Sequence, residues 1–171
     1  MKQTLGKQET QFFAYAQMRG LRSVRAGELC TPLGLTQTQE RELFRRLVRG
    51  RLIARVRPGL YLVPARLPLG GAWSPGEALA LNTLMRDRGG RYQICGPNAF
   101  NRYGFDNQVP VRTYAYNNRI SGERRIGAVQ ITLIKVADAR LGGTEKVASS
   151  DDETMVYASR ARTLVDAVYD W

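Results

Sequence analysis

Apolar residues in the first part of the chain recur with helical spacing. Residues 9–19 carry an apolar stripe that includes Phe12 and Phe13, which predicts a first helix. A second helix is expected to begin at Val24, with Ser23 as its N-terminal cap. Two short helices are therefore predicted before the most regular segment of the chain.

That segment is a helix predicted over residues 36–50. Thr36 followed three residues later by Gln39 fits a capping box. The predicted buried stripe consists of Leu43, Phe44, Leu47 and Val48. At about 100° per residue, the side chains that point away from this stripe are Thr38, Arg41, Glu42, Arg45 and Arg49, with Gln39 and Arg46 on its flank.

A β-hairpin is predicted directly after this helix, over residues 52–63. Two strand-like runs are separated by Pro58 and Gly59, which favour a tight turn. Three helices followed by a hairpin are typical of a winged helix-turn-helix, predicted for residues 1–66 with the hairpin as the wing.

The rest of the chain predicts a second domain over residues 67–171. Pro and Gly residues between 65 and 73 mark the boundary. A helix capped by Ser74 is expected to run to Arg88. Further strands are expected over 92–95, 111–116, 119–126, 128–136 and 155–158, with helices over 97–103 and after Ser159 and a loop over 137–153. The predicted class is α+β, with a small C-terminal α+β domain whose sheet is mostly antiparallel.

Charge separates the two predicted domains. The chain has 26 Lys and Arg against 15 Asp and Glu, a net charge of +11. Residues 1–66 hold 13 basic and 4 acidic side chains, a net charge of +9, and 11 of the basic residues are Arg. Such a balance indicates a polyanionic partner, although an ordinary basic domain has the same composition.

Helix order and charge placement together favour binding of double-stranded DNA. The exposed face of helix 36–50 fits a major groove, and the wing adds positive charge beside it. The candidate contacts are Thr38, Gln39, Arg41, Arg45, Arg46, Arg49, Arg55 and Arg57. An arginine-rich helix face is also common as a plain solvated surface, and a winged helix that binds proteins stays open as an alternative.

Two features of the second domain carry weaker hypotheses. Arg124 and Arg125 lie in a basic cluster that is either a solvated loop or an auxiliary contact to DNA or to another copy of the chain. Arg162 and Asp166 are four residues apart on a predicted helix, which indicates a local ion pair.

Residue types limit the chemistry. The chain has two cysteines, Cys30 and Cys95, and no histidine. It therefore cannot complete an ordinary four-ligand zinc site or use a histidine base. No P-loop or Gly-x-Gly-x-x-Gly motif is present. We predict a protein without metal or cofactor that is not an enzyme, with a nucleic-acid-processing enzyme lacking a recognisable motif as an alternative.

The sequence contains no long apolar run and no apolar leader at its N-terminus. We therefore expect a cytoplasmic protein with no membrane partner.

Several segments carry a family resemblance. The run LVRGRLIARVRPGLYLVP looks like the wing of AbiEi-type antitoxins and related winged-helix proteins, which belong to type IV toxin–antitoxin systems. The later segments SPGEALALNTLM, ICGPNAFNRYGF, NQVPVRTYAYNN and SRARTLVDAV resemble, in order, conserved blocks of the same antitoxins. The likeness covers almost the whole chain, and none of its loose motifs is a catalytic signature.

The resemblance implies an antitoxin that represses its own operon by binding inverted repeats in promoter DNA, with a homo-oligomer expected on the operator. It also implies that the second domain neutralises a nucleotidyltransferase-like toxin. One departure is that the chain ends at Trp171, just after the last block, whereas family members often continue with more helices. We therefore expect a truncated or short relative of the family.

Overall fold

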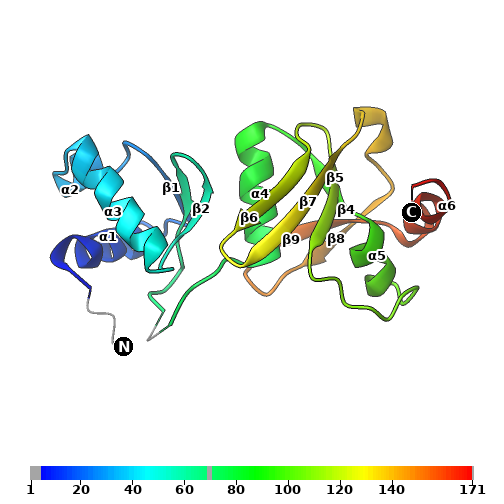
Figure 1. Ribbon diagram of the computed structural model, residues 1–171, viewed down its shortest axis with the longest axis horizontal. Helices are drawn as coiled ribbons and strands as arrows, with labels where there is room; N and C mark the ends of the chain where they lie inside the picture. The colour runs from blue at the N-terminus through cyan, green and yellow to red at the C-terminus, as the bar shows by residue number, and fades with distance from the viewer. Residues whose placement is uncertain (1–4, 69–70, 171) are drawn as a thin grey trace. The chain divides into compact units, whose positions relative to one another are not determined.

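The computed structural model describes residues 5–68 and 71–170. The chain divides into two compact units, the first formed by Met1–Pro75 with Ile126–Ala128 and the second by Gly76–Arg125 with Val129–Trp171. Both units contain helices and strands, and most of the strand pairs are antiparallel (Figure 1). The predicted α+β class with a mostly antiparallel sheet is confirmed.

The first unit combines helices with a three-stranded sheet. Its elements are α1 (Lys7–Met18), β1 (Ser23–Arg25), α2 (Cys30–Leu33), α3 (Gln37–Arg49), β2 (Ala54–Arg57) and β3 (Leu60–Leu62). The strand order is β1-β3-β2, with both pairs antiparallel. The helices predicted over 9–19 and 36–50 and the hairpin predicted within 52–63 are confirmed.

The helix predicted from Val24 is wrong, because this segment forms strand β1. Its backbone pairs with β3, with Ser23 opposite Leu62, and the Val24 side chain is 1% exposed in the core. Gly27 then takes a φ of +96°, which breaks any continuous helix. Helix α2 begins only at Cys30, so that Pro32 lies in the first turn, where a missing N–H costs little.

Both α1 and α3 bury their apolar stripes in one core. The buried members are Phe12, Phe13, Ala16, Val24, Leu29, Leu43, Phe44, Leu47, Leu52, Ile53 and Val63. The Phe44 ring meets the Phe12 ring edge-on at 6.4 Å and stacks on Tyr61 of β3 at 4.3 Å between centroids. These contacts fix the rotation of α3, because burial of each such side chain is worth about 1.5–3 kcal/mol.

The second unit is built on a six-stranded sheet with the order β6-β7-β5-β4-β9-β8. Its elements are α4 (Glu77–Arg88), β4 (Tyr92–Ile94), α5 (Gly96–Arg102), β5 (Thr113–Asn117), β6 (Gly122–Ile126), β7 (Val129–Lys135), η1 (Asp138–Arg140), β8 (Thr144–Ala148), β9 (Thr154–Ala158) and α6 (Arg160–Tyr169). The β5–β7 and β4–β9 pairs are parallel, whereas β4–β5 and β8–β9 are antiparallel. Strands β6 and β8 therefore form the two edges.

Helix α4 has more buried residues than any other helix described in this unit and is buried on most sides. Its buried residues are Ala78, Leu79, Ala80, Leu81, Thr83, Leu84 and Met85. Burial on this scale places α4 against the core of its unit. Within the described ranges, no helix has both the length and the apolar composition needed to cross a bilayer.

The loop predicted over residues 137–153 is wrong in part. It contains the short helix η1 and the edge strand β8, which pairs with β9 from Thr144 opposite Ala158 to Ala148 opposite Thr154. Most side chains of β8 are exposed. Because neither face of this strand is well buried, its sequence lacks the apolar alternation that predicts a strand.

The predicted Ser74 cap is also wrong, since α4 begins at Glu77 with Gly76 in the capping position. The Ser74 hydroxyl instead accepts a hydrogen bond from the backbone N–H of Ala128 at 2.9 Å. A side chain used by a neighbouring strand connection is not available to the helix end.

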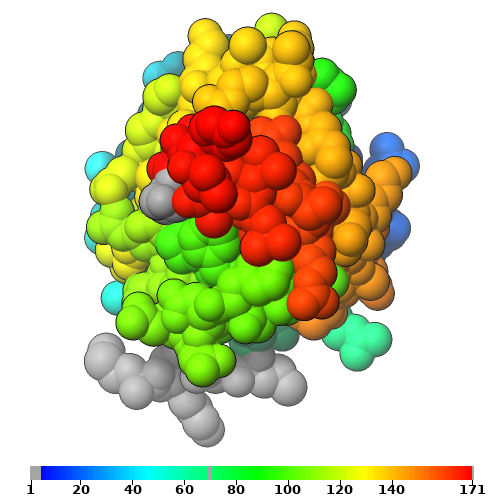
Figure 2. Space-filling model, turned by 90° about the vertical axis from the view of Figure 1, so that its right-hand side faces the viewer, coloured from blue at the N-terminus to red at the C-terminus, as the bar shows by residue number. Residues whose placement is uncertain are grey.

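Helix α6 leaves its apolar residues at the surface. Ser159 caps this helix, as predicted, by accepting from the Arg162 N–H at 3.2 Å. Figure 2 shows α6 in red beside the green segment that contains α5, which it contacts. The exposed apolar side chains are Leu164 at 51%, Val165 at 52%, Val168 at 79% and Tyr169 at 80%.

Candidate functional site

The N-terminal end of α3 is held by a capping box. The Thr36 hydroxyl accepts from the Gln39 N–H at 3.2 Å, and the Gln39 side-chain oxygen accepts from the Thr36 N–H at 2.9 Å. The predicted capping box is confirmed. Because the side-chain oxygen of Gln39 is used in the capping box, only the amide NH₂ of this candidate residue is available to an outside partner.

The exposed face of α3 carries the predicted residues. Thr38, Gln39, Arg41, Arg45, Arg46 and Arg49 are all exposed. Leu43, Phe44 and Leu47 are buried on the opposite side, while Val48 is only half-buried. Because an α-helix rises 1.5 Å per residue, the Arg41, Arg45 and Arg49 positions follow one another about 6 Å apart along the axis.

Two arginines of α3 are engaged by acidic residues. Nη2 of Arg45 lies 2.8 Å from a carboxylate oxygen of Glu42 on the same helix, and the two side chains are 65% and 45% exposed. Nε of Arg46 lies 2.7 Å from a carboxylate oxygen of Glu9, while its Nη2 donates to Gln8 at 2.8 Å. The Arg45 pair is weak because it is solvated, whereas Arg46 joins α3 to α1.

The ion pair also acts on Glu9. Burial by itself would raise the pKa of this carboxyl, but the hydrogen bond and charge of Arg46 together with backbone hydrogen bonds outweigh it, and the pKa of Glu9 is lower than its ordinary value. Arg46 therefore has a structural task that the sequence did not indicate.

Arg41 and Arg49 remain for an outside partner. Neither forms an ion pair with any residue in the part of the chain that the structure describes. Arg55, exposed on β2, is likewise unpaired within those residues. The three guanidinium groups are thus positive charges that the described fold leaves uncompensated.

The β2–β3 hairpin turns at Pro58 and Gly59, and Gly59 has a φ of +79°. The pairing register shifts between Arg55 and Arg57, which marks an irregularity in β2. Arg57 is half-buried and donates from Nη1 to the Pro58 carbonyl at 2.8 Å. Arg55 is thus exposed on β2, whereas Arg57 is bonded to the turn.

Glu40 is a buried carboxylate that is not among the predicted site residues. It is 2% exposed and accepts from the backbone N–H groups of Gly27 at 2.7 Å and Leu29 at 2.9 Å. It therefore ties the segment before α2 to the first turn of α3. The signal was present in the helical spacing, since Glu40 lies three and four residues before Leu43 and Phe44 on the buried stripe.

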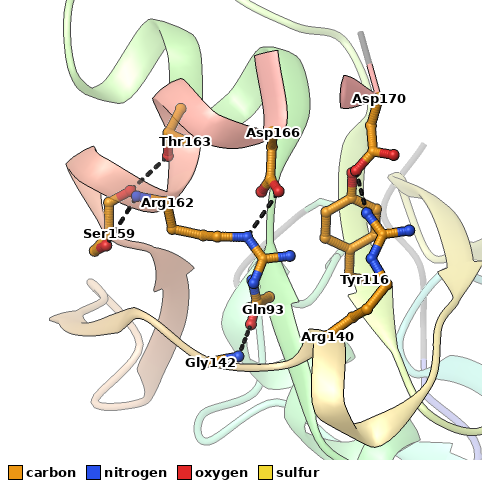
Figure 3. Close-up of polar contacts among 9 residues, drawn as sticks. All are labelled: Gln93, Tyr116, Arg140, Gly142, Ser159, Arg162, Thr163, Asp166 and Asp170. Carbon is orange, nitrogen blue, oxygen red and sulfur yellow. Dashed lines mark hydrogen bonds and ion pairs between the residues drawn. The ribbon is translucent and has the colours of Figure 1, made fainter. Parts of the chain in front are cut away.

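The second unit holds a separate polar cluster around α6 (Figure 3). Nε of Arg162 donates to Asp166 at 2.7 Å, so the predicted ion pair is confirmed. The Asp166 side chain is only 3% exposed and that of Arg162 19%, which makes this pair mostly buried. Gln93, fully buried on β4, accepts from the Gly142 N–H at 2.9 Å beside it.

A second ion pair lies one turn further along α6. Asp170 pairs with Arg140 and accepts a hydrogen bond from the Tyr116 hydroxyl at 2.9 Å. A cleft of about 470 Å³ runs between these pairs, lined by Arg140, Arg162, Val165, Asp166, Tyr169 and Asp170. Its two cations face two anions, so the cluster is suited to anchoring α6 rather than to attracting a charged ligand.

Neither cysteine has the properties of a nucleophile. Burial raises the pKa of the Cys95 thiol far above its usual range, and the charges of Asp166 and Asp170 add to this effect. Burial also raises the pKa of Cys30, helped by Glu40. The described residues contain no cluster of His, Cys, Asp or Glu side chains that could hold a metal ion.

Arg124 and Arg125 lie on β6, at the edge of the six-stranded sheet. Arg124 is half-buried and Arg125 is exposed. The predicted site residues thus fall into two groups, one on α3 and its following hairpin and one on β6.

No family model matches this chain, and no curated protein is significantly similar to it.

Proposed function

We propose that residues 1–66 form a winged helix-turn-helix that binds duplex DNA, and that the protein is a transcriptional regulator. In this proposal α3 is the recognition helix and the β2–β3 hairpin is the wing. The observation that carries it is the charge of the α3 face, where Arg41 and Arg49 are exposed and unpaired within the described residues.

The physical argument begins with the groove. A major groove about 12 Å wide admits one α-helix, and the buried stripe of α3 leaves its opposite face available. Arg41 and Arg49 are two turns apart, a spacing that suits contacts to phosphates or guanine edges along one groove. The capped first turn of α3 presents backbone N–H groups, which favour a phosphate.

The wing adds a second contact. Arg55 is exposed on β2, and charge there suits backbone or minor-groove phosphates beside the groove that α3 enters. Arg45 is available after its solvated pair with Glu42 opens, whereas Arg46 and Arg57 are engaged with other residues. We therefore rank Arg41, Arg49 and Arg55 first among the candidate contacts.

The resemblance to AbiEi-type antitoxins extends the proposal. In that form the protein represses a type IV toxin–antitoxin operon by occupying promoter repeats, as a homo-oligomer on the operator, and opposes a nucleotidyltransferase-like toxin. A co-transcribed gene for such an enzyme, whose toxicity is relieved by expressing this chain, is the expected finding. An isolated gene supports a plain regulator instead.

Binding to the DNA upstream of its own gene tests the proposal. We expect gel shifts whose affinity falls with salt by a slope of about 0.9 per phosphate contact. The double variant R41Q/R49Q should bind more weakly and lower that slope by roughly two. The matched control R19Q/R66Q removes the same charge from two exposed arginines outside α3 and the hairpin.

Three outcomes contradict the proposal. Equal losses in both double variants mean that net charge alone attracts DNA. No shift by the unmodified protein at low salt favours a winged helix that binds proteins. Metal-dependent turnover of nucleic acid, abolished by a carboxylate substitution, would instead make the chain an enzyme.

A further inference from the structure

A hollow of about 280 Å³ lies at the open edge of the six-stranded sheet in the second unit. It is lined by Arg112, Glu123, Arg124, Arg125, Gln130 and Ile131. These residues come from the end of the segment before β5, from edge strand β6 and from β7. The hollow is therefore a place where distant parts of the sequence bring arginines together.

The sheet explains how this happens. Strand β7 lies between β6 and β5, and Thr113 of β5 is paired with Ile131 of β7. This register sets Arg112 beside Gln130, across the sheet from β6. Successive side chains of a strand point to opposite faces, but beside the open edge that β6 forms both Arg124 and Arg125 line the same hollow.

The residues that line the hollow carry a net positive charge, since three of them are arginines and Glu123 is the one carboxylate among them. Arg112 forms an ion pair with Glu123, but the two side chains are 40% and 68% exposed, so this pair is weak and can open for another anion. Arg124 donates from Nη1 to the Glu123 carbonyl at 2.8 Å, which holds its guanidinium at the rim.

We propose that this hollow binds a backbone phosphate of duplex DNA, so that the second unit adds phosphate contacts to those of α3. The inference rests on the proposed DNA-binding function. Guanidinium groups form forked, charge-assisted hydrogen bonds with phosphate oxygens. Water occupies about 30 Å³ per molecule in the liquid, so 280 Å³ is room for a phosphate group and several waters.

DNA is favoured over other occupants by the rest of the chain. The net charge is +11, and the arginine side chains of α3 face outward from the first unit. A phosphodiester backbone offers an anion at every step, which suits a chain that carries exposed arginines in both of its units, whereas a single small anion occupies one place only. The contact carries no base information, because a phosphate is present at every step.

The test compares two double variants of the full chain. R124Q/R125Q removes two positive charges at the hollow, and R86Q/R88Q removes two from exposed arginines at the end of α4 in the same unit. Binding to a 30-base-pair duplex of random sequence is measured by fluorescence anisotropy over a series of salt concentrations. We expect roughly tenfold weaker binding and a salt slope lower by one to two for R124Q/R125Q only.

The other outcomes separate the two proposals. Equal changes in R124Q/R125Q and R86Q/R88Q overturn the phosphate site and leave the proposed function standing. The same holds if R124Q/R125Q binds as the unmodified chain does while R41Q/R49Q loses binding. No duplex binding by the unmodified chain overturns both. A changed oligomeric state of R124Q/R125Q in light scattering, with an unchanged salt slope, assigns these arginines to contact between copies and overturns the phosphate site.

Circular dichroism confirms folding of each variant. Should R124Q/R125Q unfold, the single variant R125Q replaces it, since Arg125 is exposed on the edge strand. The expected change is then a salt slope lower by about one.

Discussion

Helices α3 and α6 handle charge and apolar surface in opposite ways. Helix α3 buries Leu43, Phe44 and Leu47 and leaves its arginines outside. Helix α6 buries Asp166 and leaves Val168 and Tyr169 outside. The comparison teaches that charge alone does not mark an arginine for an outside partner, because Arg162 has the same charge as Arg41 but is engaged inside its own unit.

The largest expected effect concerns the internal pair of α6. Arg162→Ala should lower the free energy of unfolding by about 3–5 kcal/mol, because it leaves the Asp166 carboxylate buried and uncompensated. Chemical denaturation measures the change. Arg91→Ala is the control, since its pair with Asp138 is 68% and 69% exposed and should contribute no more than about 1 kcal/mol. Similar losses in the two variants would remove the contrast between buried and solvated pairs.

The next effect concerns Glu40 in the first turn of α3. Glu40→Gln should cost about 2–3 kcal/mol, because a charged acceptor of two backbone N–H groups becomes a neutral amide with one oxygen. Glu42→Gln on the exposed face of the same helix should change stability by less than about 0.5 kcal/mol. If urea unfolding gives the same loss of stability for Glu40→Gln as for Glu42→Gln, the hydrogen bonds that Glu40 accepts do not contribute to stability.

The third effect is on DNA affinity and compares Arg41, unpaired within the described residues, with the paired Arg45 on α3. Arg41→Ala should weaken binding by about 1–3 kcal/mol and relax specificity if the contact is to a base, or weaken all sequences alike if it is to a phosphate. Arg45→Ala should cost less, since Arg45 must first leave Glu42. Glu42→Gln should therefore strengthen binding slightly. Titrations with promoter and random duplexes measure all three, and a stronger effect of Arg45→Ala would reverse this ranking.

The smallest effect is expected on the outer face of α6. Val168→Ser should change the free energy of unfolding by less than about 0.5 kcal/mol, because this side chain is 79% exposed. Thermal unfolding is the measurement. A loss above about 2 kcal/mol means that the apolar face is covered in solution, and the comparison with α3 then no longer holds.

Local signals in the sequence predicted much of this molecule. The capping box at Thr36, the stripe of α3, the Pro58–Gly59 turn and the Ser159 cap each depend on a few neighbouring residues, and all are present. The predictions that were wrong concern segments whose hydrogen-bonding partners lie far away in the sequence. Strand β1 exists because β3 offers it hydrogen bonds, and β8 exists because β9 does.

The same reasoning applies to the candidate site. Exposure of the α3 arginines follows from helical spacing, so the sequence predicted it. The partners of Arg46 are 37 and 38 residues away on α1, and Arg112 meets the β6 arginines only through the sheet order. No local pattern contains that information. The position of Glu40 beside the apolar stripe can be read from helical spacing, but its partners Gly27 and Leu29 lie in a different segment.

Both outer strands of the six-stranded sheet are rich in ionic side chains, with Glu123, Arg124 and Arg125 on β6 and Glu145 and Lys146 on β8. Unpaired strand borders are templates on which other chains add and grow into aggregates, and ionic residues suppress such growth. Neutralising the arginines of β6 therefore has a consequence beyond ligand contact, because it makes this edge strand more prone to pair with another chain. Concentrated samples of such variants should turn turbid sooner than the parent protein.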